Sequence, residues 1–166
     1  MELVVREARV EDAAAIVAIL NPIIAAGQYT AFDTPFTVDA EQAYLRGFPA
    51  RGVFHVAVHP VDQRVRGFQS MEPFATYTHA FDHVGTLGTY VDQASRRQGV
   101  ASALFAATFA AARRKDYEKL FTFVRGDNPG ALATYVKHGF AVVGTARRHA
   151  KIAGAYVDEI MIERFL

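Results

Sequence analysis

The chain has 166 residues, with 18 Lys and Arg against 17 Asp and Glu, so its formal net charge is +1. This length suits one domain, and the near-neutral charge argues against a protein that grips nucleic acid or an anionic membrane, since both need concentrated basic charge. Hydrophobic residues make up 51% of the chain and cysteine is absent, which predicts a folded core and excludes disulfides, thiolate metal sites and cysteine nucleophiles.

In chain order, the residue patterns predict a strand over Leu3–Ala8, a helix from Glu11, a loop over Gly27–Thr37, a helix over Asp39–Phe48, paired strands over Gly52–His59 and Val65–Glu72, and a loop over Pro73–Asp82. They continue with a strand over Gly85–Val91, a helix over Val100–Lys115, a buried strand over Leu120–Val124, a helix over Asn128–His138, and strands over Phe140–Gly144 and Tyr156–Phe165. We expect the first helix to kink or end near Asn21, because Pro22 has no backbone N–H to donate.

This order of elements predicts one mixed α/β domain over residues 1–166. The first residues, Met1–Arg6, lack the apolar run of a signal peptide, and no stretch approaches the ~20 apolar residues of a membrane helix. We therefore expect a soluble, cytoplasmic protein.

The turn from Arg96 to Ser102 leads into a predicted helix and carries two arginines and a glycine. A helix N-terminus presents unpaired N–H groups at the positive end of the helix dipole, so it suits a phosphate or pyrophosphate. The turn is neither a P-loop, since no Gly-Lys-Ser/Thr follows, nor a dinucleotide fingerprint, since the first glycine is missing. For this turn alone, the alternative is an ordinary helix start with two solvated arginines.

The segment from Asn128 to Phe140 is the second candidate for ligand binding. Asn128 can cap the helix that Pro129 begins, and Tyr135 lies two turns along the same face. An amide and a phenol in this arrangement could contact one extended ligand. The alternative is a capped helix whose tyrosine only fills space.

Taken together, these segments resemble the GCN5-related N-acetyltransferase (GNAT) superfamily, which has a strand, an Arg-x-x-Gly-x-Ala turn, a helix, a buried strand, and then Asn, Tyr and Gly-Phe in this order. The resemblance covers essentially the whole chain, and Ala14–Phe36 and Lys151–Asp158 resemble the phosphinothricin acetyltransferase-like branch. It implies a single-domain α/β GNAT fold, with a mixed, mostly antiparallel sheet of about seven strands flanked by about four helices. It also implies acetyl-CoA as the co-substrate.

The resemblance assigns roles to particular residues. The backbone of Thr89, Tyr90 and Val91 would bond the pantetheine arm of acetyl-CoA as an added strand would, and Asn128 would bond the pantetheine as well. The pyrophosphate would be held by Arg97, Gln98, Gly99, Val100, Ala101 and Ser102. Tyr135 would protonate the leaving thiolate, for which a phenol donor is suited. Because the chain has no cysteine, we expect direct attack of an amine on the thioester.

The general base is where this chain departs from the branch. Its members commonly carry a carboxylate just before the strand equivalent to Leu87–Val91, but this chain has Gly85, Thr86 and Gly88 there. The candidates in or beside the preceding loop are Glu72, His79, Asp82 and His83. We hypothesise that His83 or Glu72 takes the amine proton, the alternative being an amine that arrives neutral.

Aromatic residues are frequent in the two predicted loops: Phe32, Phe36, Phe74, Tyr77 and Phe81. Because the resemblance implies that these loops wall the acceptor site, we expect Phe32, Phe36 and Tyr77 to contact the acceptor and Glu72 or Asp82 to hold an ammonium group. Small aromatic clusters under loops are the alternative.

We expect no metal site. His55 and His59 are four residues apart on a predicted strand, which separates them by about 13 Å, too far to share one ion. His79 and His83 have the same spacing in a loop, where we also expect no metal.

Three functions remain open. The first is acetyl transfer to the primary amine of a small molecule, such as an amino acid, an analogue like phosphinothricin or methionine sulfone, or a polyamine. The second is an acyl-CoA-binding sensory module without turnover, which the missing carboxylate suggests, and the third is N-acetylation of a protein or peptide. By resemblance to related enzymes, we expect a homodimer.

Overall fold

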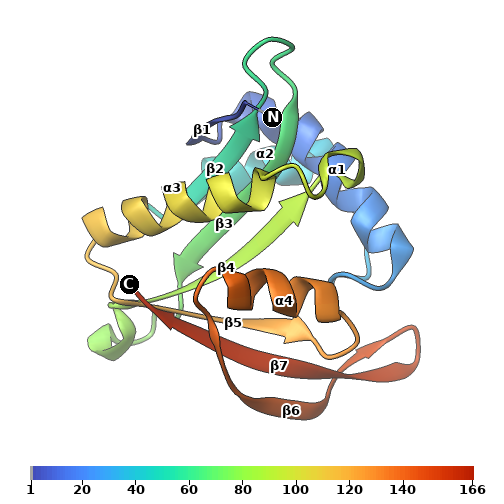
Figure 1. Cartoon of the computed structure of the whole chain (residues 1–166), viewed down its shortest axis with the longest axis vertical. Helices are drawn as coiled ribbons and strands as arrows, with labels where there is room; N and C mark the ends of the chain where they lie inside the picture. Colours follow the sequence, from blue (N-terminus) through green and yellow to red (C-terminus); the bar gives the residue numbers. More distant parts are fainter. Residues whose placement is uncertain (1) are drawn as a thin grey trace.

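The computed structural model describes residues 2–166. Within them, the strands are β1 (Val4–Glu7), β2 (Val53–Val58), β3 (Val65–Pro73), β4 (Val84–Val91), β5 (Lys119–Arg125), β6 (Ala141–Ile152) and β7 (Ala155–Phe165). The α-helices are α1 (Ala13–Ala26), α2 (Val38–Arg46), α3 (Val100–Arg114) and α4 (Pro129–Lys137), as Figure 1 shows.

All seven strands form one sheet in the order β1-β2-β3-β4-β5-β7-β6. Every neighbouring pair is antiparallel except β4 and β5, which run parallel in the middle of the sheet. This seven-stranded mixed sheet with four α-helices confirms the predicted α/β fold class.

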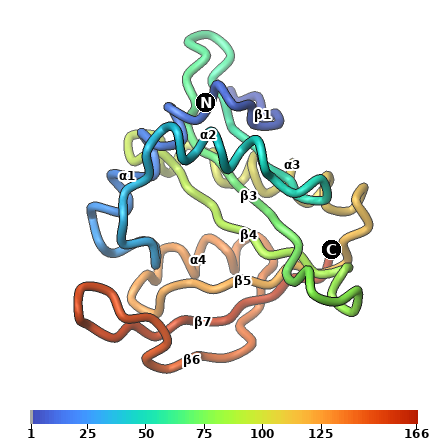
Figure 2. The backbone as a smooth tube through the Cα atoms, turned by 180° about the vertical axis from the view of Figure 1, so that it is seen from behind, coloured from blue at the N-terminus to red at the C-terminus, as the bar shows by residue number. Residues whose placement is uncertain are grey.

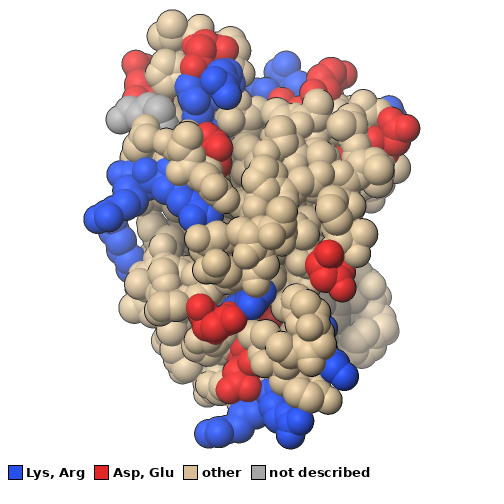
Figure 3. Space-filling view, turned by 90° about the vertical axis from the view of Figure 1, so that its right-hand side faces the viewer, with Lys and Arg blue, Asp and Glu red and all other residues tan. Residues whose placement is uncertain are grey.

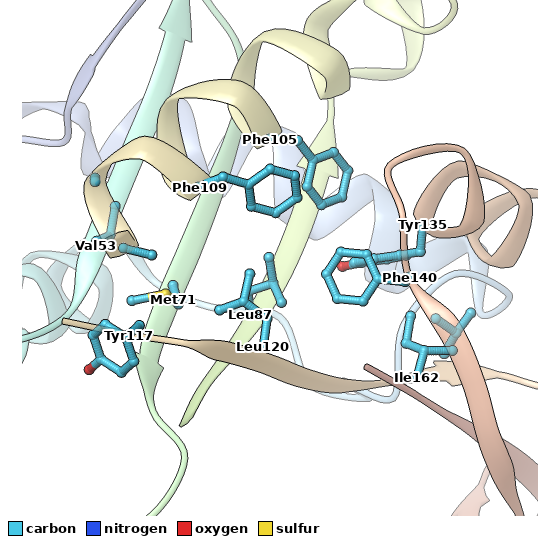
Figure 4. Close-up of a cluster of buried hydrophobic side chains, with 13 residues drawn as sticks. Val53, Met71, Leu87, Phe105, Phe109, Tyr117, Leu120, Tyr135, Phe140 and Ile162 are labelled. Carbon is cyan, nitrogen blue, oxygen red and sulfur yellow. The ribbon is translucent and has the colours of Figure 1, made fainter. Parts of the chain in front are cut away.

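The helices cover both faces of the sheet. Helix α1 packs on β2 and β3 through an apolar cluster that includes Ile16, Leu20 and Phe68, and it lies beside α2 (Figure 2). On the other face, Phe105 of α3 and Tyr135 of α4 meet the central strands in a second cluster, shown in Figure 4. The second cluster therefore fixes α3 over β2, β3 and β4, and α4 over β5.

Helix α1 differs from the sequence prediction, because it continues through Pro22 and ends only at Ala26. Of the two outcomes predicted near Asn21, a kink or an end of the helix, the end is therefore wrong. Proline removes one backbone hydrogen bond, but the last turn is held by the burial of Ile23 and Ile24 in the core beneath it. Gly27 then ends the helix in the left-handed conformation, with φ of 69°.

The end of the chain forms a longer hairpin than the sequence pattern indicated. Strand β6 continues beyond Gly144 to Ile152, and it pairs with β7 in three registers separated by two irregularities. Polar and charged residues dominate the second half of β6, so the alternation of apolar and polar residues that marks a strand is hidden there.

In residues 2–166, no helix is both long and apolar enough to span a membrane.

Candidate active site

The central parallel pair of strands opens into a V. Strands β4 and β5 pair only at Val84 with Lys119 and at Gly85 with Leu120. Further along, the hydroxyl of Thr122 donates to the carbonyl of Leu87 at 2.8 Å, and beyond that point the strands diverge (Figure 1). The edge of β4 from Gly88 to Val91 is thus left for an added strand-like ligand.

The N-terminus of α3 lies beside this opening. No side chain caps the helix, and Gly99 precedes it with φ of 88° in the left-handed conformation. Arg97 also has a positive φ, 61°, which is uncommon for a residue with a side chain. Successive N–H groups in such a turn form a concave anion site at the positive end of the helix dipole.

A cavity of about 610 Å³ joins the V to the start of α3. Ten of the eleven residues predicted to bind acetyl-CoA line it: Thr89, Tyr90, Val91, Arg97, Gly99, Val100, Ala101, Ser102, Asn128 and Tyr135. Gln98 is the exception, because its amide donates to the carbonyl of Ala94 at 2.9 Å on the surface. The structure thus brings two segments about thirty residues apart in sequence into one site.

The charge of this cavity is positive. Arg96, Arg97 and Lys137 line it, whereas no acidic residue is among the described residues that do. The guanidinium carbon of Arg96 lies 4.5 Å from the ring centre of Tyr29, which holds the arginine at the rim. On this side of the molecule, Lys and Arg gather along the left edge of a broad uncharged surface (Figure 3).

His138 is a cavity residue that the sequence analysis did not find. Its Nδ1 lies 2.8 Å from the carbonyl of Thr134, which can only accept, so Nδ1 donates. In the neutral ring, Nε2 then accepts from the hydroxyl of Ser102 at 3.0 Å. The hydroxyl of Ser102 is therefore engaged, and its backbone N–H is the group left for an anion.

Asn128 caps α4, as the sequence predicts. Its Oδ1 accepts from the N–H of Ala131 at 3.1 Å, and Pro129 occupies the first turn. The cap uses the amide oxygen, so only Nδ2 remains for a ligand. Nδ2 lies 3.5 Å from the carbonyl of Tyr29, which links this cap to the segment after α1.

Tyr135 is a buried residue of the cavity lining, and its phenol oxygen points from α4 toward β4 (Figure 4). This oxygen lies 3.1 Å from Oγ1 of Thr89. Burial raises the pKa of Tyr135 far above its usual range, and the hydrogen bond with Thr89 offsets this only in part. The phenol thus stays protonated at neutral pH, as a proton donor must.

Glu72, on β3, lies on the opposite face of the sheet from Thr89. It pairs directly with Thr86 of β4, one of the positions at which the resemblance to the branch leads us to expect a carboxylate. Together with burial, the nearby Glu72 carboxylate raises the pKa of Tyr44 on α2. Helix α2 adds a second carboxylate, that of the buried Glu41, and burial raises the pKa of this group.

The histidine candidates lie farther away. His83 precedes β4, and six residues of extended chain, about 20 Å, separate it from Thr89. Its carbonyl accepts from the N–H groups of Glu118 and Lys119. His79 is on the surface, where Nδ1 lies 2.9 Å from a carboxylate oxygen of Asp82. The structure therefore separates these three residues from Tyr135.

The aromatic residues form two separate groups. Phe32 packs edge-on against Phe36 at 5.3 Å and lies 6.4 Å from Tyr90 between ring centres. The side chain of Asn21 holds Phe36 through two hydrogen bonds of 2.9 Å to its backbone. Tyr77, which is 83% exposed, contacts only Phe81 of the other loop among these rings. The four predicted acceptor residues thus do not share one wall.

Gln69 is a second residue that the sequence analysis missed. It is completely buried on β3, and its amide donates to Thr89 at 2.7 Å. A lone glutamine in a strand pattern carries no signal by itself, since only the register of β3 with β4 shows what it faces.

Within residues 2–166, no three His, Asp or Glu side chains form a group that could hold a metal.

Comparisons with known proteins agree with this geometry. YwnH of Bacillus subtilis (strain 168), named a candidate phosphinothricin acetyltransferase, is 29% identical over 164 residues, which cover 99% of each protein. The L-amino acid N-acetyltransferase AaaT of Escherichia coli (strain K12) is 36% identical over 85 residues, 49% of this chain and 51% of that protein.

The shared fold is also seen in a crystal structure of the phosphinothricin acetyltransferase (Pat) from Sinorhizobium meliloti in complex with AcCoA. It superposes with a TM-score of 0.91 at 19% identity and covers 100% of this chain and 89% of that one. Residues 24–140, more than half of the chain, match the acetyltransferase (GNAT) family. The chain therefore belongs to the acetyltransferase (GNAT) family.

Proposed function

We propose that this N-acetyltransferase moves the acetyl group of acetyl-CoA directly to the primary amine of a small molecule. The observation that carries the proposal is the open V between β4 and β5, with the uncapped start of α3 and the phenol of Tyr135 lining the same cavity. The start of α3 suits the pyrophosphate, the free edge of β4 suits the pantetheine arm, and the phenol suits the thioester at the end of that arm.

The cavity suits acetyl-CoA in shape and charge. The free edge of β4 supports binding of the amide-rich pantetheine arm, and the N–H groups from Gly99 to Ser102, with Arg97, support binding of the pyrophosphate. A crystal structure of similar fold carries AcCoA. These residues would bind and orient the donor, and their chemistry is electrostatic.

The amine attacks the thioester carbonyl, an N–C bond forms, the C–S bond breaks, and the thiolate receives a proton. Tyr135 donates that proton, because its raised pKa keeps the phenol protonated at neutral pH and the residue lines the cavity. The nitrogen loses one proton, for which we propose Glu72 as the acceptor, directly or through water. The products are an amide and free CoA, and no covalent enzyme intermediate is needed.

Glu72 is a better candidate for the base than His83. Its cross-strand partner Thr86 lies three residues before Thr89 on β4, about 10 Å along the strand, whereas His83 lies six residues before it. Glu72 also stands beside the position at which the branch carries its carboxylate. A base one strand away thus substitutes for the missing side chain.

For the acceptor, we propose a small amine of the amino acid, amino-acid analogue or polyamine type. The names of YwnH and AaaT support phosphinothricin and L-amino acids as the first compounds to test. Phe32 offers an exposed ring beside Tyr90, and Glu72 offers a negative charge for an ammonium group.

The test is release of CoA thiol from acetyl-CoA in the presence of L-amino acids, phosphinothricin, methionine sulfone, polyamines and aminoglycosides. Because the chain has no cysteine, a thiol reagent reports CoA alone. Turnover with one class of amine, reduced in Tyr135→Phe and unchanged in Tyr117→Phe, supports the proposal. Tyr117 is a matched control, since it is a buried core tyrosine outside the cavity.

No turnover with any small amine, while acetyl-CoA still raises the melting temperature, would contradict the proposal. It would favour the second candidate, an acyl-CoA-binding module without turnover, which the absence of a carboxylate at Gly85, Thr86 and Gly88 supports. Acetylation of peptide N-termini in the same assay would instead favour a protein substrate.

We also propose a homodimer. Strand β6 forms the end of the sheet, and Val142 and Val143 on it are about half exposed. An edge strand with exposed apolar residues is open to pairing with another chain unless it is covered. Light scattering after size exclusion tests this, and a monomer at micromolar concentration would contradict it.

A further inference from the structure

Gln69 is a fully buried polar residue in the apolar layer beneath α3. On β3 it lies between His55 of β2 and Thr89 of β4, the residues directly opposite it on the two neighbouring strands. Met71, two residues further on the same face, is an equally buried apolar residue. A buried amide in such a place is costly unless its hydrogen bonds are used.

The amide begins a short chain of hydrogen bonds that ends at Tyr135. Nε2 of Gln69 donates to Oγ1 of Thr89 at 2.7 Å, and Oγ1 of Thr89 lies 3.1 Å from the phenol oxygen of Tyr135. Because Thr89 already accepts from Gln69, its own proton is available for the phenol oxygen, its other partner among the described side chains. The phenol then accepts from Thr89 and keeps its own proton free.

The opposite direction has the opposite consequence for the phenol. If an acceptor stood at position 69, the hydroxyl of Thr89 would donate to it and would accept from Tyr135 instead. The phenol proton would then be held by Thr89 and would have to leave that bond before it could reach a thiolate. The direction of two hydrogen bonds thus decides whether the acid is ready to donate.

His55, the neighbour on β2, does not hold the amide of Gln69. Its Nδ1 forms a hydrogen bond of 3.0 Å with Thr108 on α3, and its other ring nitrogen makes no hydrogen bond to Oε1 of Gln69. Oε1 of Gln69 has no hydrogen-bond partner within residues 2–166. The chain therefore buries an amide of which only the donor half is paired, and that donor faces Thr89.

We propose that Gln69 is a positioning residue that acts through Thr89, fixing the direction of the hydrogen bonds so that the proton of Tyr135 stays free for the leaving thiolate. The inference rests on the proposed function, in which Tyr135 is the proton donor. Gln69 itself touches neither the acetyl donor nor the amine.

The first test is Gln69→Glu, which keeps the size of the side chain but offers only acceptors once it is ionised. We expect kcat to fall about tenfold or more, with the KM for acetyl-CoA within about twofold of wild type. The loss should increase with pH, because a protonated carboxyl can still donate to Thr89. Met71→Leu is the packing control and should leave kcat unchanged.

Thr89 offers a second pair of variants in case Gln69→Glu fails to fold. Thr89→Val removes the hydroxyl at nearly constant volume and should lower kcat as Gln69→Glu does, while Thr89→Ser should retain activity. In a double-mutant cycle, Gln69→Glu should have no further effect once Tyr135 is Phe. Additive losses in this cycle would overturn the inference.

A binding measurement separates this inference from the proposed function. Free CoA bound in the cavity has a thiol whose pKa Tyr135 should lower by donating to the thiolate, and the ultraviolet absorbance of the thiolate reports it against a desulfo-CoA complex. Gln69→Glu and Tyr135→Phe should raise that pKa by similar amounts. Equal values in wild type and Gln69→Glu would overturn the inference, whereas a wild type that turns over no amine would overturn only the proposed function.

Discussion

In the proposed function, the site binds its two substrates through different kinds of groups, backbone groups for the donor and side chains for the acceptor. The groups offered to acetyl-CoA, which form the donor side, are backbone edges and helix ends: the free edge of β4, the uncapped start of α3 and the capped start of α4. The groups proposed for the acceptor side are side chains, namely the ring of Phe32 and the carboxylate of Glu72, and the two lie on separate segments of the chain.

This difference separates what the fold supplies from what the individual chain supplies. Backbone groups keep their places whatever side chains surround them, so a donor site made of them follows from the topology. An acceptor site made of side chains can shift a function from one strand to the next, as we propose for the carboxylate of Glu72, which lies on β3 opposite Thr86 of β4. We therefore expect donor-side substitutions to alter binding and acceptor-side substitutions to alter the choice and deprotonation of the amine.

The largest effect is expected at Tyr135, where the two sides meet. Tyr135→Phe should lower kcat by about 100-fold or more, because it removes the proton for the thiolate, while the Kd for acetyl-CoA should change by less than about threefold. Since burial raises the pKa of this phenol, the acid form persists as pH rises, and wild-type kcat should show no alkaline decline up to about pH 10. A decline near pH 8 that Tyr135→Phe abolishes would contradict this.

Glu72→Gln should have the next largest effect. We expect kcat/KM for the amine to fall about 10- to 100-fold near neutral pH, and to recover at alkaline pH as the amine loses its own proton. His83→Ala should match wild type throughout. The register offers a rescue, since Thr86→Glu in the Glu72→Gln background places a carboxylate on the directly opposite residue of β4. An unchanged kcat/KM in Glu72→Gln, or a loss that Thr86→Glu does not restore, would argue against Glu72 as the base.

Asn128→Ala tests whether a residue of the donor side binds acetyl-CoA in addition to capping α4. It removes the cap of α4, which should lower stability by about 1 kcal/mol and the melting temperature by roughly 2–4 °C. It should also weaken acetyl-CoA binding by about tenfold, because Nδ2 is lost with the cap.

Thr37→Ala is the matched control for this loss of a cap. Its hydroxyl caps α2 by accepting from Ala40 at 3.1 Å, so the melting temperature should fall by a similar amount. Its Kd for acetyl-CoA, measured by calorimetry, should stay at the wild-type value. An equal change of Kd in both variants would mean that stability alone, and not contact with the donor, sets the affinity.

The same division explains how much could be predicted from the sequence. The donor side was predictable because Gly99, Asn128 and Pro129 are local signals of helix ends, and ten of the eleven residues assigned to it do line the cavity. His138 and Gln69 were not predictable, because each acts through a contact between distant elements, with Ser102 and Thr89 respectively. Pro22 misled the prediction because the burial of its neighbours outweighs the lost hydrogen bond.

The smallest expected effect concerns Phe32, which is 44% exposed and lies beside Tyr90. Phe32→Leu keeps an apolar side chain but removes the ring face, so the KM for the amine should rise roughly two- to tenfold while the KM for acetyl-CoA stays constant. Tyr77→Leu is the matched change in the other aromatic group, which connects to Phe81. If only Phe32→Leu raises the KM, the acceptor lies against the segment after α1, which Asn21 holds through Phe36. If only Tyr77→Leu raises the KM, the acceptor lies against the loop between β3 and β4 instead. The carboxylate of Glu72, near the end of β3, would then bind the ammonium group in addition to taking its proton.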